Sequence, residues 1–65
     1  MNKYFKILLE CTDKVSREHL VRKYGEALVD EVIKNGYIVE IGKTDIGDPQ
    51  HIITTRGKEI RDKKF

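Results

Sequence analysis

Positively charged side chains lie in two parts of the sequence and are the residues best suited to bind a charged partner. Arg17, Arg22 and Lys23 belong to the stretch SREHLVRKYG. Arg56 and Lys58 belong to TTRGKEI, near the C-terminus. Such side chains donate to phosphate oxygens and provide most of the affinity for nucleic acid. A solvated charged surface is the alternative interpretation, because the formal net charge is only +2.

Residues that could support catalysis or metal binding do not form a recognisable set. His19, His51 and Cys11 belong to three different predicted elements, and none has a zinc-ligand spacing. We expect both histidines at the surface and Cys11 in the core. The Gly-Lys-Thr of IGKTDIGDP lacks the earlier glycine and the following helix of a phosphate-binding loop. We therefore expect no enzyme activity, no cofactor and no metal.

The length of 65 residues predicts a single small domain spanning residues 1–65. No apolar stretch approaches the roughly 20 residues that cross a bilayer, and the first 15 residues have a charged interior. A lone cysteine agrees with a reducing compartment. We expect a folded, soluble, cytoplasmic protein that does not bind membranes.

Three helices and then a hairpin must position the charged residues. Apolar residues at helical spacing predict helices in NKYFKILLEC, after Ser16 in TDKVSREHLVRKYG, and in EALVDEVIKNG. Ser16 is a good N-cap, Gly25 suits the turn after the second helix, and Asn35-Gly36 ends the third. YIVEI and HIITT then read as two strands joined by a loop over residues 42–50. Thr54 or Thr55 caps a last helix, whose apolar positions are Ile60 and Phe65.

The apolar positions of these elements predict the core. On the first helix the expected inward residues are Tyr4, Phe5, Leu8 and Leu9, followed by Cys11. The side chains expected to form the centre of the core are Leu8, Leu20, Val29, Val32, Ile33, Val39 and Ile53. Each of the three tyrosines lies on the apolar face of its predicted element. We therefore interpret Tyr4, Tyr24 and Tyr37 as residues at the edge of the core and not as platforms on which bases stack. Gly57 is expected to allow the last helix to pack closely against its neighbours.

Two motifs resemble parts of a known fold. VDEVIKNGYIVE looks like the third helix and exit strand of winged-helix repressors, and IITTRGKEI looks like their second wing strand running into a helix. The chain thus resembles the winged helix-turn-helix domains of small bacterial or phage-type transcriptional regulators. The resemblance implies an α+β fold with three helices, a β-hairpin wing and a C-terminal helix. It also implies DNA as a partner and a homodimer.

The resemblance places the third helix in the major groove and the wing over the DNA backbone. Carried onto this chain, it gives as candidate DNA-binding residues Arg17, Arg22, Lys23, Ala27, Asp30, Lys34, Lys43, Arg56 and Lys58.

The third helix departs from the usual pattern because its outward residues are net acidic. Glu26, Asp30 and Glu31 oppose only Lys34, and in the hairpin Lys43 is offset by Asp45 and Asp48; we interpret Glu26 as favourable to the helix dipole. Two functions remain open: a DNA-binding regulator, or a winged-helix module that binds another protein through the acidic third helix.

Overall fold

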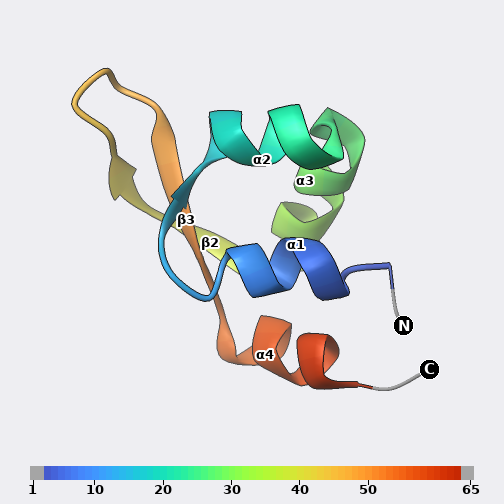
Figure 1. Ribbon diagram of the computed structural model, residues 1–65. Coiled ribbons are helices and arrows are strands. Elements are labelled where there is room, and N and C mark those ends of the chain that lie inside the picture. The colour runs from blue at the N-terminus through green and yellow to red at the C-terminus, as the bar shows by residue number, and fades with distance from the viewer. Residues whose placement is uncertain (1–2, 64–65) are drawn as a thin grey trace.

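The computed structural model describes residues 3–63 and has four helices and a three-stranded antiparallel sheet, so the predicted α+β class is confirmed. In chain order the elements are α1 (Phe5–Glu10), β1 (Val15–Ser16), α2 (Arg17–Tyr24), α3 (Glu26–Lys34), β2 (Ile38–Lys43), β3 (Pro49–Ile53) and α4 (Thr55–Asp62). In Figure 1 the β2–β3 hairpin projects beyond the helices. No described helix has the length and apolar character needed to cross a bilayer.

The helix boundaries follow local signals in the sequence. Ser16 caps α2, because its Oγ accepts a hydrogen bond from the backbone N–H of His19 at 3.3 Å. Gly25 alone joins α2 to α3, with a φ of +91° that side chains disfavour. Gly36, at φ +77°, follows α3 and turns the chain into β2. The one-residue connection at Gly25 keeps α2 and α3 close together in space.

The sheet has the strand order β1-β3-β2, with β3 in the centre. His51 of β3 lies opposite Val15 of β1 and opposite Glu40 of β2. A bulge falls between Glu40 and Gly42. The loop is shorter than the predicted 42–50, because β2 continues to Lys43 and β3 already begins at Pro49. Gly42 therefore serves the bulge and not the loop.

The core lies between the helices and the covered face of the sheet. Its buried side chains are Ile7, Leu8, Cys11, Leu20, Val29, Val32, Ile38 and Ile53. All but two of the predicted central residues are among them. Ile33 packs against this cluster and is only partly buried. Val39 was predicted wrongly, since its side chain is 47 % exposed.

Two elements present a different face to the core from the one predicted. On α1, Ile7 is buried and Leu9 is 53 % exposed, because Tyr4, Ile7 and Leu8 form the inward stripe that continues to Cys11. On β2, Ile38 pairs with Ile53 on the covered face. Neighbouring strand residues point to opposite faces, which turns Val39 outward.

The junction between the hairpin and α4 explains why a glycine, Gly57, stands three residues after Thr54. The Thr54 hydroxyl accepts a hydrogen bond from the N–H of Gly57 at 3.0 Å and donates to the carbonyl of Gly36 at 2.6 Å. Gly57 is buried, and a Cβ atom there would lie 2.1 Å from the carbonyl oxygen of Tyr37. Close packing at Gly57 is confirmed. The predicted apolar position Phe65 lies outside the described residues.

Candidate nucleic-acid interface

The exposed side of α3 is the surface that the sequence singled out for a partner. Ala27, Asp30 and Lys34 are exposed on this helix, as the helical period predicts. Gly25 is the N-cap of α3 and has no side chain with which to cap the helix. The carboxylates of α3 are contacted by charged residues from other parts of the chain.

Arg17, at the start of α2, reaches across to α3. Its Nη2 atom lies 2.8 Å from Oδ1 of Asp30 and 4.0 Å from Oε1 of Glu26. The side chain of Arg17 is 33 % exposed, so this contact is accessible to solvent. One guanidinium is thereby shared by the two carboxylates at the N-terminal part of α3.

The third carboxylate of α3 is held by the N-terminal segment. Glu31 accepts a hydrogen bond from the Tyr4 hydroxyl, and Nζ of Lys3 lies 3.0 Å from its Oε2. The Tyr4 hydrogen bond, followed by that of Lys3, lowers the pKa of Glu31. The Tyr4 ring meets Tyr37 edge-on, with centroids 5.3 Å apart. Tyr4, Tyr24 and Tyr37 are partly buried against the core, as predicted.

The other α2 cations predicted to contact phosphate also have carboxylate partners. Arg22 lies 2.6 Å from Glu18, one turn earlier on the same helix. Lys23 lies 2.8 Å from Glu10 of α1, which also contacts His19. The hydrogen bond from Lys23, with that from His19, lowers the pKa of Glu10. Exposed ion pairs of this kind contribute little to stability, so a phosphate can replace the carboxylate at modest cost.

The remaining candidate cations are exposed and form no ion pair with another residue in the 3–63 range; they are Lys34, Lys43, Arg56 and Lys58. The Arg56 side chain lies beside Gly36, since its Cδ is 4.0 Å from the position of a Cβ there. The turn after α3 therefore brings Arg56 near the end of the helix that carries Lys34. Lys43 belongs to a different place, the outer part of the hairpin.

The histidines differ from the expectation that both lie at the surface. His19 is exposed, but His51 is only 3 % exposed on the central strand. Its Nδ1 atom is buried without a hydrogen-bond partner among the described residues, and burial lowers the pKa of the ring. Cys11 is buried as predicted, and that burial raises the pKa of its thiol to about 12. A thiol with so high a pKa is a poor nucleophile.

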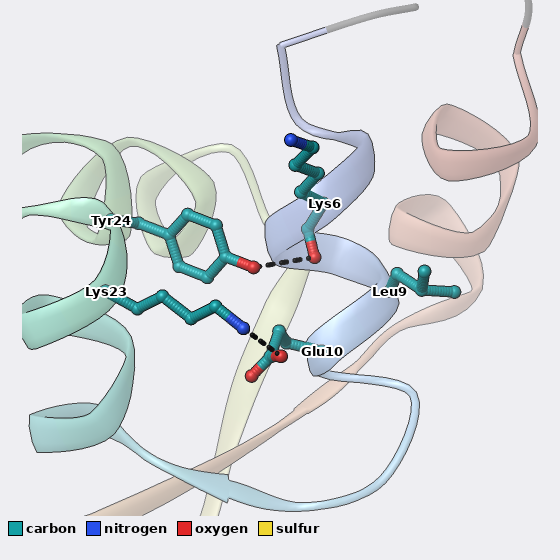
Figure 2. A pocket seen from close by; sticks show the side chains of 5 residues that line it. All are labelled: Lys6, Leu9, Glu10, Lys23 and Tyr24. Carbon is teal, nitrogen blue, oxygen red and sulfur yellow. Dashed lines mark hydrogen bonds and ion pairs between the residues drawn. The ribbon is translucent and has the colours of Figure 1, made fainter.

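A pocket between α1 and α2 is a feature that sequence reasoning missed. Its volume is about 530 Å³, and its lining residues are Lys6, Leu9, Glu10, Lys23 and Tyr24. Figure 2 shows Lys23 and Tyr24 reaching from α2 toward α1, where the Tyr24 hydroxyl donates to the carbonyl of Lys6 at 3.2 Å. No single stretch of sequence signals this pocket, because it depends on how two helices pack.

Comparison of the chain with protein-family models, with curated proteins and with solved structures finds no match. The contacts of the molecule itself therefore carry the functional interpretation.

Proposed function

We propose that this chain is a small winged-helix DNA-binding protein, of the kind that regulates transcription in bacteria or mobile elements. In this proposal α2, Gly25 and α3 form the helix-turn-helix, and the β2–β3 hairpin is the wing. The order of elements supports it, since three helices precede the hairpin and α4 follows. So does the short connection at Gly25, because a tight turn is characteristic of this motif.

The observation that carries the proposal is the charge balance around α3. Taken alone, the helix presents Glu26, Asp30 and Glu31, which would repel a duplex. Arg17 and Lys3 contact these carboxylates from outside the helix. With Lys34 included, three cations balance the three carboxylates. The repulsion inferred from sequence is thus largely removed.

The exposed cations then supply the attraction. α3 approaches the major groove with Ala27 and Lys34, while Arg56 and Lys58 at the start of α4 contact the phosphate backbone. Arg22 contributes where a phosphate displaces Glu18, whereas Arg17 stays with Asp30 and Glu26, and Lys23 stays with Glu10. Contacts of this kind position the protein and carry little sequence information, so the first activity to measure is general affinity for a duplex.

Fluorescence anisotropy with a labelled mixed-sequence duplex tests the proposal. We expect binding that weakens with salt, with a log-log slope of about −0.9 for each phosphate neutralised. The double change Lys34→Glu and Arg56→Glu should weaken binding and reduce the slope by roughly 1.8, for two lost contacts. Replacing Asp30 by Asn should strengthen binding, because it removes one carboxylate and releases Arg17.

Lys14 provides the matched control, because it is exposed and lies outside the proposed interface. Lys14→Glu causes the same charge change per residue, so it should affect only long-range attraction and leave the slope nearly unchanged. If the parent protein and the Asp30→Asn variant both fail to bind at low salt, the proposal is wrong.

A winged-helix module that binds another protein without DNA is the second candidate. It is favoured by four large apolar side chains that are well exposed, namely Leu9, Val39, Ile41 and Ile46. In that case DNA affinity stays negligible, and neutralising Asp30 and Glu31 weakens capture of the cognate protein. Asp30→Asn therefore separates the two candidates, because it strengthens DNA binding in the first and weakens capture of the protein partner in the second.

A further inference from the structure

The tip of the β2–β3 hairpin holds an apolar side chain in water. Ile46 is 82 % exposed, the highest value among the exposed large apolar residues of the described chain. Backbone hydrogen bonds close the turn that carries it: Thr44 donates its N–H to the carbonyl of Asp48 at 2.8 Å, and Gly47 donates to the carbonyl of Thr44 at 2.9 Å. Asp45 and Asp48 flank Ile46 on either side. The tip thus presents an exposed apolar side chain between two carboxylates.

The pocket between α1 and α2 has the complementary character. Lys6 and Lys23 contribute two ammonium groups, and Leu9 contributes an apolar side chain that is 53 % exposed. Lys6 forms no ion pair with another residue of the described chain. The volume of about 530 Å³ lies within the roughly 300–1,000 Å³ typical of ligand pockets. It can therefore admit a side chain the size of isoleucine.

We propose that the hairpin tip of one copy of this chain docks into the α1–α2 pocket of a second copy. Ile46 packs against Leu9, and Asp45 and Asp48 pair with the ammonium groups of Lys6 and Lys23. The tip does not occupy the pocket of its own chain, since Figure 1 shows it projecting away from α1. Charge complementarity and two exposed apolar partners together identify a second copy as the occupant.

Glu10, the carboxylate inside the pocket, does not reverse this complementarity. It is held by Lys23 at 2.8 Å and by His19 at 2.8 Å. Lys6 and Lys23 outnumber it, so the pocket keeps a positive balance toward the two aspartates of the tip. Glu10 also fixes the position of the Lys23 ammonium, which reduces the entropy lost when a partner binds.

The tip and the pocket are different surfaces, so each copy can both give and receive a tip. Two copies related by a two-fold axis make the contact twice and close into a dimer. This inference concerns self-association and does not depend on DNA binding. It can therefore hold or fail independently of the proposed function.

Sedimentation velocity over a concentration series tests the inference. We expect the parent protein to form a dimer that weakens with salt. Ile46→Ser and Leu9→Ser should each weaken self-association roughly 10- to 100-fold, because each removes one side of an apolar contact. An equimolar mixture of the two variants should regain one contact, since the intact tip of one fits the intact pocket of the other.

Val39→Ser is the matched control, because Val39 is also exposed and lies elsewhere, on β2. It should leave the dimer unchanged, and circular dichroism should show all three variants folded, since none of these side chains is buried. A parent protein that stays monomeric at every concentration overturns the inference. So does loss of the dimer in Val39→Ser, or a mixture that associates no better than its components.

Discussion

At the scale of single residues, a few positions combine strict geometry with burial. Thr54 and Gly57 form one such pair, because the hydroxyl caps α4 while the missing side chain lets α4 approach Tyr37. His51 is a second, a polar ring on the central strand with a buried nitrogen that has no partner among the described residues. Both features can be tested by single substitutions.

Gly57→Ala should destabilise the fold by roughly 1–3 kcal/mol, because the added methyl group meets a backbone carbonyl that cannot rotate away. The gain of about 1 kcal/mol in helix propensity does not offset this overlap. Urea unfolding measures the difference, and Glu59→Ala at an exposed site of α4 serves as control. A Gly57→Ala protein as stable as its parent would show that α4 does not pack closely at this point.

Because His51 is buried, we expect the free energy of unfolding to decrease in mild acid. Burial, with the nearby Arg17, lowers the pKa of the ring from its ordinary value of 6.5, while Glu40 acts in the opposite direction. As the pH falls below 6.5, the ring takes up a proton in the unfolded chain before it does so in the folded chain. The free energy of unfolding therefore decreases as the pH is lowered, until the pH passes below the pKa of the folded state. Unfolding measured at several pH values should show a smaller decline in His51→Gln than in the parent.

The second histidine supplies the control for that experiment. His19→Gln changes an exposed residue paired with Glu10, so the contribution of His51 to the decline should persist. Equal declines in the parent and His51→Gln would mean that the buried ring does not affect the acid response.

At the scale of elements, local signals in the sequence predicted boundaries better than faces. Ser16, Gly25 and Thr54 mark helix ends through bonds and dihedral angles that involve near neighbours, so their roles can be read from the sequence. The face of β2 could not be read in this way. Ile38 and Val39 are both apolar, and only the pairing of Ile38 with Ile53 decides which one is covered.

The candidate site was less predictable than the fold for a related reason. Its charged residues were identifiable, but their partners lie far along the chain. Arg17 meets Asp30, 13 residues away, and Tyr4 meets Glu31, 27 residues away. Such pairs depend on helix packing and leave no local pattern. The neutralised state of α3 therefore emerged only from the three-dimensional arrangement.

Val39 of β2 is exposed and Val32 of α3 is buried, so the stability cost of truncating the two valines can be compared directly. Val32→Ala should destabilise the protein by roughly 1–4 kcal/mol, because it removes buried methyl groups and leaves a cavity. Val39→Ala should cost less than about 0.5 kcal/mol, as expected for an exposed position. Thermal or urea unfolding of both variants checks this, and a larger loss in Val39→Ala would restore the strand phase first predicted.

At the scale of the whole molecule, the proposed DNA-binding and self-association surfaces lie on different elements. In the two proposals, α3 and the start of α4 face DNA, whereas the hairpin tip and the α1–α2 pocket mediate self-association. The acidic tip suits this division, because Asp45 and Asp48 would repel phosphate groups. DNA binding and dimerisation can thus occur in the same assembly.

Amide chemical-shift mapping by NMR tests whether α3 and the adjoining start of α4 bind a duplex, as we propose. Titrating a ¹⁵N-labelled protein with a short mixed-sequence duplex at low salt should shift the amides of Ala27, Asp30, Lys34 and Arg56 most strongly. Amides at the hairpin tip, around the exposed Ile46, should shift little. The absence of shifts at any concentration, or shifts confined to residues outside α3 and α4, would contradict the claim.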